Sequence, residues 1–332
     1  MEQTKHRLID QYKRTLNYLR ISITDRCNLN CIYCTPRHGV PKLNHEDILR
    51  YEEILRLAGI AVRLGVDKIR LTGGEPLVRK GVYEFIPKLT ALPGLKEVSL
   101  TTNGIYLKEN LERIKAAGIN RINVSLDTMN RGTYRKITGY DGFPQVWEGI
   151  EWARVLGFDP IKINIVPLKG INDSEFLDFA RLSLEHPYHI RFIEHMPLGT
   201  VGPEVQTNYI PNSKIKAQIS RLGELIPVPR TKYDGPAARF RLEGAAGEIG
   251  FISPLTDHFC KTCNRLRLTA EGHLRPCLLS DKDEDLKNPM RNGASDQELE
   301  LIFLNTVFKK PRSHHLDSLE PTPSSQMSSI GG

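Results

Sequence analysis

The stretch YLRISITDRCNLNCIYC, residues 18–34, joins a short β-branched run to three cysteines spaced C-x3-C-x2-C. The run alternates in the manner of a strand, and the cysteines follow at the point where that strand should end. A disulfide uses two cysteines and a tetrahedral zinc site uses four ligands, so three thiols in one loop indicate another use. The stretch therefore predicts a strand whose carboxyl end carries a metal or cluster site.

The cysteines of the chain fall into two sets of three. They are Cys27, Cys31 and Cys34, then Cys260, Cys263 and Cys277. The N-terminus lacks an apolar secretory stretch, so we expect a cytoplasmic protein with reduced thiols, and metal or cluster binding is favoured over buried, inert thiols.

Three thiolates suit a [4Fe–4S] cluster, because they leave one of its four irons open for a ligand that is also a reactant. A histidine is the alternative fourth ligand, and three lie near the triplets. These are His38, His258 and His273.

Six β-branched runs alternate with stretches of helical length, which is typical of βα units and a parallel sheet. The expected strands are 18–24, 68–72, 97–102, 121–127, 161–166 and 189–196. The expected helices include HEDILRYEEILRLAGIAVRLG and LKENLERIKAAG, the second ending at Gly118. Each of these strands ends in polar or glycine-rich residues, such as TDRC, TGGEP and TTNG, and we expect the six ends to form one ligand-binding rim.

The chain has 332 residues, 39% of them hydrophobic, which is enough for a large core. After about residue 226 the sequence becomes rich in Pro and Gly with short alternating runs, which favours hairpins. We therefore expect a partial (β/α)6 TIM-like barrel over residues 14–225, with a smaller iron–sulfur domain over 226–332 that closes the barrel mouth. The final expected helix is ASDQELELIFLNTVFKK.

Five basic residues lie inside five different expected strands. They are Arg20, Lys68, Arg70, Lys162 and Arg191. A buried unpaired charge is costly, so these residues predict an anionic ligand, and structural pairing with carboxylates such as Asp127 or Glu194 is the alternative. No Walker phosphate loop occurs, so charged side chains would hold a bound phosphate. The net charge of +7 is too diffuse to indicate nucleic acid, and no apolar run is long enough to indicate a membrane span.

The cysteine spacing, the tyrosine before the third cysteine and TGGEP after the second strand together resemble the radical S-adenosylmethionine superfamily. The second half narrows the resemblance. CKTCNRLRLTAEGHLRPC, with NVSLD, RFIEHMP and the terminal Gly-Gly, resembles the GTP 3′,8-cyclase family of molybdenum cofactor biosynthesis from about residue 18 to the end. That resemblance implies a lyase that converts GTP to (8S)-3′,8-cyclo-7,8-dihydroguanosine 5′-triphosphate. A 5′-deoxyadenosyl radical would remove the hydrogen at C3′ of GTP.

The resemblance also implies two [4Fe–4S] clusters, one on each triplet, with S-adenosylmethionine at the first and guanine at the second. It implies S-adenosylmethionine contacts at Tyr33, Gly74, Ser125 and Met196. It implies GTP contacts at Arg20, Lys68, Arg70, Thr101, Lys162, Arg191, Arg265, Leu266 and Arg267, with Arg265 and Arg267 as the catalytic pair. The family's tail enters the active site, so we expect the same of QMSSIGG.

The partners that the resemblance implies are an electron donor, cyclic pyranopterin monophosphate synthase as the downstream enzyme, and a second copy in a homodimer. Two other functions are weighed. A peptide-crosslinking radical enzyme should have additional cysteines in its C-terminal domain, and an iron–sulfur electron carrier or RNA-binding protein would not need TGGEP.

Overall fold

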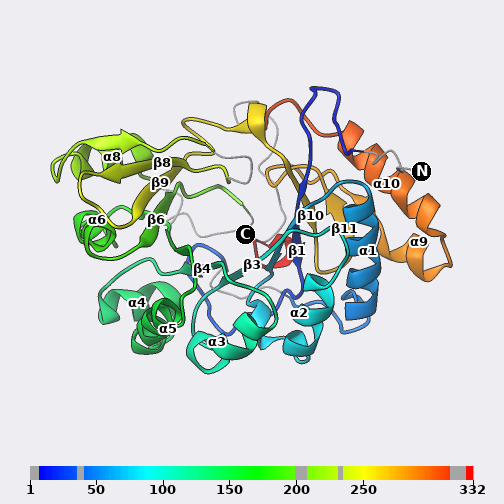
Figure 1. The fold of residues 1–332 in the computed structure, drawn as a ribbon, viewed down its shortest axis with the longest axis horizontal. Helices are drawn as coiled ribbons and strands as arrows, with labels where there is room; N and C mark the ends of the chain where they lie inside the picture. Colours follow the sequence, from blue (N-terminus) through cyan, green and yellow to red (C-terminus); the bar gives the residue numbers. More distant parts are fainter. Residues whose placement is uncertain (1–6, 36–40, 199–207, 231–234, 315–326, 332) are drawn as a thin grey trace.

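One twelve-stranded sheet carries the fold in the computed structural model, which describes residues 7–35, 41–198, 208–230, 235–314 and 327–331. Its strand order is β12-β11-β10-β1-β2-β3-β4-β5-β6-β9-β8-β7. Every neighbouring pair from β10 to β9 is parallel, and the two outer strands at each edge are antiparallel. Figure 1 shows the sheet as a curved wall around the C-terminus, with helices outside it.

The first six strands follow the expected βα order. They are β1 (Tyr18–Ser22), β2 (Lys68–Thr72), β3 (Glu97–Thr102), β4 (Ile122–Ser125), β5 (Ile161–Ile165) and β6 (Tyr188–Ile193). Each expected strand is confirmed, and several end a few residues earlier than expected because the polar residues after them form loops. The later strands are β7 (Leu225–Pro227), β8 (Ala238–Leu242), β9 (Glu248–Ile252), β10 (Arg265–Leu268), β11 (His273–Arg275) and β12 (Glu284–Asp285).

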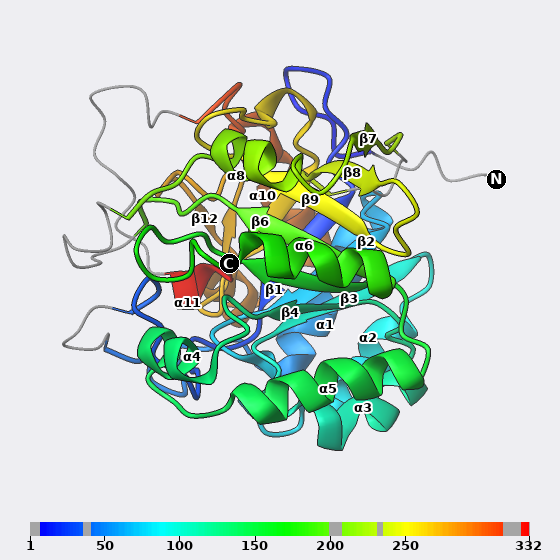
Figure 2. The same cartoon turned by 90° about the vertical axis from the view of Figure 1, so that its left-hand side faces the viewer.

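The helices cover the outer face of this sheet (Figures 1 and 2). They are α1 (Tyr51–Arg63), α2 (Val82–Thr90), α3 (Leu107–Ala116), α4 (Arg131–Thr138), α5 (Phe143–Val155), α6 (Phe176–Glu185), α8 (Asn212–Ile219), α9 (Lys287–Arg291) and α10 (Asp296–Phe308). The short α11 (Met327–Ile330) lies on the inner side instead, and two 3-10 turns are η1 (Pro76–Val78) and η2 (Cys260–Thr262). The expected stop after α3 is present, since Gly118 has φ +92°. Ser295 and Glu298 form a capping box that starts α10.

The segment after residue 226 forms the expected antiparallel hairpins, but it also extends the barrel sheet. β9 pairs in parallel with β6, and β10 pairs in parallel with β1. An unpaired strand edge exposes backbone groups, and these two strands pair both edges of the six-stranded unit. The partial barrel and its C-terminal extension agree with the expected fold class, while the division at residue 225 stays a prediction.

The two cysteine triplets lie at opposite ends of the parallel strands. Cys27 follows the carboxyl end of β1, whereas Cys263 precedes the amino end of the parallel neighbour β10. Cys277 follows β11, which runs antiparallel to β10 and so returns to that same amino end. The second cysteine set therefore lies at the amino ends of the parallel strands, because β10 enters the sheet parallel to β1 and the CKTC stretch comes just before it.

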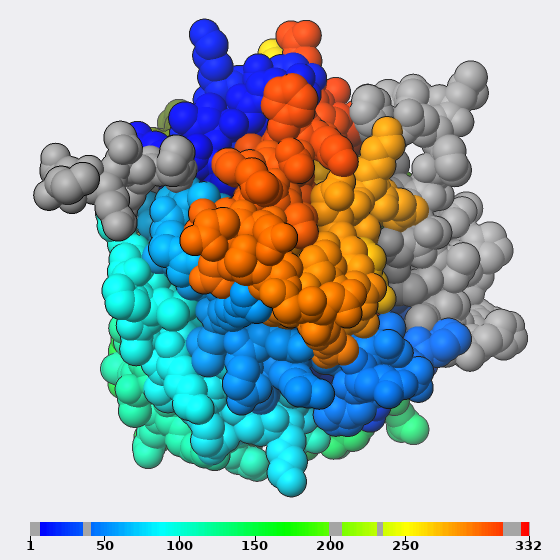
Figure 3. All heavy atoms as spheres, turned by 90° about the vertical axis from the view of Figure 1, so that its right-hand side faces the viewer, coloured from blue at the N-terminus to red at the C-terminus, as the bar shows by residue number. Residues whose placement is uncertain are grey.

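Helix α10 packs beside α1 on the outside of the molecule, where Figure 3 shows it in orange over the blue N-terminal part. Asp296 pairs with Arg56 at 2.8 Å and with Arg63 at 2.7 Å. No helix in the described ranges combines the length and the apolar character that crossing a membrane requires.

Candidate active site

A cavity of about 210 Å³ lies at the carboxyl ends of the strands and contains the first cysteine triplet. The residues expected to contact S-adenosylmethionine all line it. These are Tyr33, Gly74, Ser125 and Met196. The loops after β1, β2, β3, β4 and β6 thus meet as the strand-end motifs predict.

Asp127 holds the loop of the first triplet in place. Its Oδ2 accepts a hydrogen bond from the Tyr33 hydroxyl at 2.6 Å, and its Oδ1 accepts one from the backbone of Val166 at 2.8 Å. Burial raises the pKa of Asp127 to about 6, although both hydrogen bonds oppose that rise. From sequence alone, Asp127 is identified only as a counter-charge for the strand cations. Its hydrogen bond with Tyr33 joins residues 94 positions apart, so no local pattern predicts it.

Glu75, inside TGGEP, holds together the loops that line the same cavity. Its carboxylate accepts hydrogen bonds from the backbone of Leu77 and Asn103 and from the Thr102 hydroxyl, and burial raises its pKa to about 7. A Cβ on Gly74 would lie 2.4 Å from the Arg26 carbonyl oxygen. That contact gives Gly74 a packing reason for lacking a side chain, in addition to the expected approach of a ligand.

The first triplet sits in surroundings that disfavour bare thiolates. Burial raises the pKa of Cys27, raises that of Cys31 well above its ordinary value and raises that of Cys34 to about 12. Bound iron stabilises thiolates, so these cysteines suit a cationic cluster. Within the described ranges no three His, Cys, Asp or Glu side chains are placed to hold a single metal ion.

A second cavity, of about 140 Å³, contains the other triplet and the strand cations. The predicted GTP contacts that line it are Arg20, Lys68, Arg70, Thr101, Lys162, Arg191, Arg265 and Arg267. Leu266 alone among the predicted contacts lies elsewhere, because its side chain points into the hydrophobic core between two inward-facing arginines.

The two cavities share part of their walls. The shared residues are Thr101, Asn164, Ile193 and Met196. The buried Oγ1 of Thr101 and Oδ1 of Asn164 have no hydrogen-bond partner among the residues that the structure describes. A polar ligand that spans the shared wall would satisfy both atoms.

The cations of the second cavity differ in how they are compensated. Lys68 pairs with Glu97 at 2.7 Å, so the carboxylate-pairing alternative holds there, but with a different partner. Asp127 contacts Tyr33 instead, and Glu194 accepts its hydrogen bonds from residues such as Thr256. Neither of these contacts involves a strand cation.

Lys162 and Arg191 form no hydrogen bond or ion pair with another described residue. Burial, followed by the neighbouring Arg191 and Arg70, lowers the pKa of Lys162 to about 5. Burial and Arg70 lower the pKa of Arg191 to about 9. An anion in the cavity would stabilise the charged forms of both groups and raise their pKa values.

Cys263 of the second triplet lies in electropositive surroundings. Burial raises the pKa of Cys263, but Arg265 and Lys310 outweigh burial and bring it to about 6. Of the histidine alternatives, His258 lines the cavity, His273 binds Asp283 at 2.9 Å, and His38 lies outside the described residues.

The C-terminal tail reaches the interior. Ile330 is buried, and Met327 and Ser328 line the first cavity. The Gly331 carbonyl accepts a hydrogen bond from Arg267 of β10 at 2.5 Å. The described part of the tail therefore lies where the two cavities approach each other, and Gly332 lies outside the described residues.

Comparison with known proteins identifies the family. A family model described as the Radical SAM superfamily matches residues 21–183, and one described as Molybdenum Cofactor Synthesis C matches residues 188–316. A protein of Moorella thermoacetica named GTP 3′,8-cyclase is 52% identical over 97% of this chain and 99% of its own length. This chain belongs to the GTP 3′,8-cyclase family. Another GTP 3′,8-cyclase, from Heliobacterium modesticaldum, is 46% identical over 98% of this chain and 100% of that protein.

Solved structures with a similar fold include Streptococcus suis SuiB bound to S-adenosylmethionine, with a TM-score of 0.58 and 13% identity, covering 91% of this chain and 66% of SuiB. At that identity the likeness shows the fold alone. Membership of the GTP 3′,8-cyclase family, within the radical S-adenosylmethionine superfamily, implies a [4Fe–4S] cluster and S-adenosylmethionine. Both expectations about the family and its fold are confirmed.

Proposed function

We propose that this chain converts GTP to (8S)-3′,8-cyclo-7,8-dihydroguanosine 5′-triphosphate, the first step of molybdenum cofactor biosynthesis. The observation that carries the proposal is one barrel interior with a cysteine triplet at each end and buried cations between them. The shared walls of the two cavities allow a radical source at one end to face a nucleotide that enters from the other.

The first triplet and its cavity would hold the radical source. When bound there, a [4Fe–4S] cluster and S-adenosylmethionine would supply the radical chemistry that removes the C3′ hydrogen of GTP. Tyr33, Gly74, Ser125 and Met196 would hold S-adenosylmethionine, because all four line this cavity. The Tyr33–Asp127 hydrogen bond fixes the loop that carries Cys31 and Cys34.

The triphosphate would lie along the strand cations. Arg20, Arg70 and Arg267 occupy neighbouring register positions on β1, β2 and β10. Alternation along each strand directs these side chains into the barrel while their neighbours pack outward. A triphosphate would supply the counter-charge that Lys162 and Arg191 lack among the described residues. Binding it through these side chains requires no Walker loop.

The second triplet would hold a second [4Fe–4S] cluster, with its open iron available to the guanine. Cys260, Cys263 and Cys277 all line the cavity that contains the GTP-binding cations. Arg265 and Arg267 lie beside this triplet, so we assign them to orienting the nucleotide and stabilising charge that develops on it. Leu266 would contribute through its backbone.

The reaction also needs partners outside the chain. Reductive cleavage of S-adenosylmethionine would consume one electron, and the radical left when C3′ bonds to C8 would need a second electron and a proton to give the dihydro product. An external donor would supply both electrons. The product retains the triphosphate and needs a further rearrangement, for which we propose cyclic pyranopterin monophosphate synthase as the next enzyme.

A homodimer is the proposed assembly, and a stripe on α10 supports it. Leu301, Leu304 and Phe308 share one helix face and are 59%, 38% and 67% exposed. A Leu301→Asp, Phe308→Asp variant should sediment as a monomer while Val155→Asp, at another exposed apolar site, sediments as a dimer. Equal masses for the unmodified protein and both variants would show that this stripe is not part of the dimer interface.

The proposed reaction is tested by anaerobic reconstitution with iron and sulfide, followed by GTP, S-adenosylmethionine and a reductant. We expect about eight irons per chain and GTP-dependent formation of 5′-deoxyadenosine with a cyclised guanosine triphosphate. A Cys277→Ala variant should still cleave S-adenosylmethionine slowly but lose the cyclised product. Full iron loading without a GTP-dependent product contradicts the substrate assignment, and cyclisation by Cys277→Ala contradicts the role of the second triplet.

A further inference from the structure

Lys310 is a buried lysine that ties together two cysteine-bearing segments of the second triplet. It is 2% exposed and lies just after α10. Its Nζ donates a hydrogen bond to the Arg265 carbonyl at 2.9 Å and another to the Pro276 carbonyl. Arg265 follows Cys263 by two residues, and Pro276 immediately precedes Cys277. One ammonium group thus fixes the relative positions of two cysteines.

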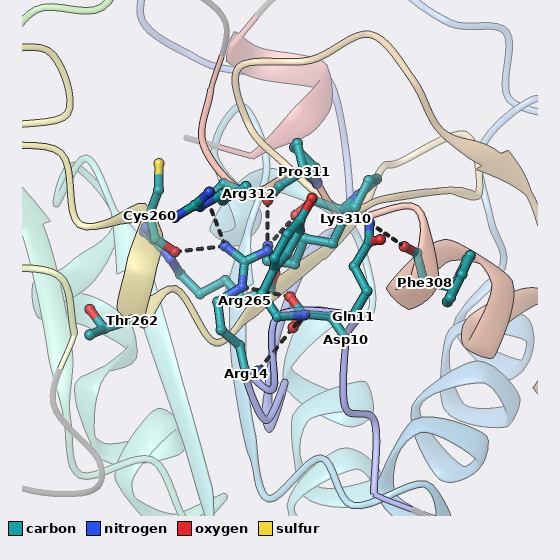
Figure 4. Close-up of polar contacts among 12 residues, drawn as sticks. Asp10, Gln11, Arg14, Cys260, Thr262, Arg265, Phe308, Lys310, Pro311 and Arg312 are labelled. Atoms are coloured by element: carbon teal, nitrogen blue, oxygen red, sulfur yellow. Dashed lines mark hydrogen bonds and ion pairs between the residues drawn. The ribbon is translucent and has the colours of Figure 1, made fainter.

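Arg14 ties the remaining cysteine to the same place (Figure 4). Its Nη1 donates to the Cys260 carbonyl at 2.7 Å, and its Nη2 donates to the Pro311 carbonyl at 2.6 Å. Asp10 balances this arginine through an ion pair of 2.5 Å. All three cysteine segments are therefore anchored on the short stretch that follows α10.

The charge of Lys310 is not compensated in the same way as that of Arg14. Among the described residues Lys310 has carbonyl partners but no carboxylate in an ion pair. Burial lowers the pKa of Lys310, and the thiolates of Cys263 and Cys277 act against that lowering. A buried cation needs a compensating anion, and the thiolates of a bound cluster are the anions placed to provide it.

We propose that Lys310 is a positioning residue for the second cluster, holding Cys263 and Cys277 through neighbouring carbonyls and favouring the reduced cluster through its charge. The inference rests on the proposed second cluster. Reduction adds negative charge, so a fixed cation nearby makes reduction more favourable, and its loss makes the midpoint potential more negative.

The experiment uses the full chain with Cys27→Ala, Cys31→Ala and Cys34→Ala, so that iron binds only at the second triplet. Lys310→Gln keeps a donor for the carbonyls without the charge, Lys310→Met loses both, and Lys310→Arg keeps the charge. Lys287→Met is the matched control, because this partly buried lysine donates to the Asp47 carbonyl away from both triplets. Bound iron and the potential of the cluster, followed by electron paramagnetic resonance, are measured in each protein.

We expect Lys310→Gln to bind close to four irons and to lower the equilibrium constant for reduction about tenfold, a shift of about 59 mV for one electron. Lys310→Met should also lose more than half of its iron on desalting, and Lys310→Arg and Lys287→Met should keep the starting potential.

An unchanged potential in Lys310→Gln, with iron retained by Lys310→Met, overturns the inference while leaving the second cluster in place. If the chain with Lys310 intact binds no iron, the proposed second cluster fails and the inference fails with it. Should Lys310→Met not fold, the comparison of Lys310→Gln with Lys310→Arg still decides the effect of the charge.

Discussion

Arg267 donates a hydrogen bond from Nη1 to the Gly331 carbonyl at 2.5 Å, which links a cation of the barrel interior to the C-terminal tail. Gly331 has φ +71°, and a Cβ there would lie 2.6 Å from Cγ2 of Thr72. Backbone conformation and packing therefore both favour glycine at this position. The tail occupies the interior by specific contacts with β2 and β10.

Gly331→Ala should displace the tail and lower the rate of GTP-dependent product formation at least tenfold. Iron content and slow S-adenosylmethionine cleavage should persist, because the atoms nearest this position belong to Thr72 and Ser22 rather than to a cysteine. Gly293→Ala is the control, since Gly293 also has a positive φ of +90° but has open space around its Cβ position. Product assays on both variants decide the matter, and equal rates would show that the tail contact is dispensable.

GTP binding should be coupled to proton uptake by Lys162. The pKa of this lysine is lowered to about 5 by burial and neighbouring cations, so the free protein holds it neutral at pH 7. A bound triphosphate raises that pKa and charges the amine. The affinity should therefore fall as the pH rises above about 5, by up to about tenfold per unit.

Calorimetry in buffers of different ionisation enthalpy measures this proton uptake. Lys162→Arg keeps a permanent charge and should bind GTP with about one proton less taken up. Titration of the phosphates is common to both proteins and cancels in the comparison. Equal proton uptake by the two proteins would show that Lys162 is already charged before GTP binds.

Arg191→Met should stabilise the protein in the absence of nucleotide and weaken GTP binding. The arginine is buried without a hydrogen-bond or ion-pair partner in the described part of the chain, and replacing such a charge is often stabilising, here by about 1–3 kcal/mol. Urea unfolding measures the gain, and equilibrium binding measures an expected loss of at least tenfold in affinity. Arg131→Met, which removes an exposed pair with Asp141, should change stability by less than about 1 kcal/mol. A loss of stability in Arg191→Met would mean that the cation is already compensated.

Asp127→Asn should remove a pH dependence of stability. The folded pKa is raised from 3.8 to about 6, so the folded protein binds a proton that the unfolded chain releases, and stability falls as pH rises across that interval. The asparagine can keep both hydrogen bonds, with Tyr33 and with Val166. The difference in the free energy of unfolding between the two reconstituted proteins should change by about 2 kcal/mol from pH 4 to pH 6. A difference that is constant with pH would contradict the raised pKa.

Local pattern was enough to predict the barrel strands and both cysteine triplets. The β-branched runs of β1 to β6 alternate with helical periods, and each pattern involves residues close in sequence. The strand cations were also predictable, because Lys162 or Arg191 inside a hydrophobic run demands a partner.

Long-range pairing could not be read in the same way. The local sequence of β10 does not indicate that this strand pairs in parallel with β1. That pairing places Cys263 at the amino end of the barrel. Lys310 follows a helix in the stretch KKPR, which reads as an exposed C-terminus, and only the tertiary structure buries it against Arg265 and Pro276. The Tyr33–Asp127 contact likewise joins residues that are 94 positions apart.

The most direct measurement follows deuterium from the 3′ position of GTP. The fully reconstituted protein is supplied with [3′-²H]GTP, S-adenosylmethionine and a reductant, and 5′-deoxyadenosine is analysed by mass spectrometry. The account predicts that one deuterium enters 5′-deoxyadenosine for each cyclised product, because the radical source at one end of the barrel reaches the ribose of a nucleotide held at the other. Cyclised product accompanied by unlabelled 5′-deoxyadenosine would contradict it.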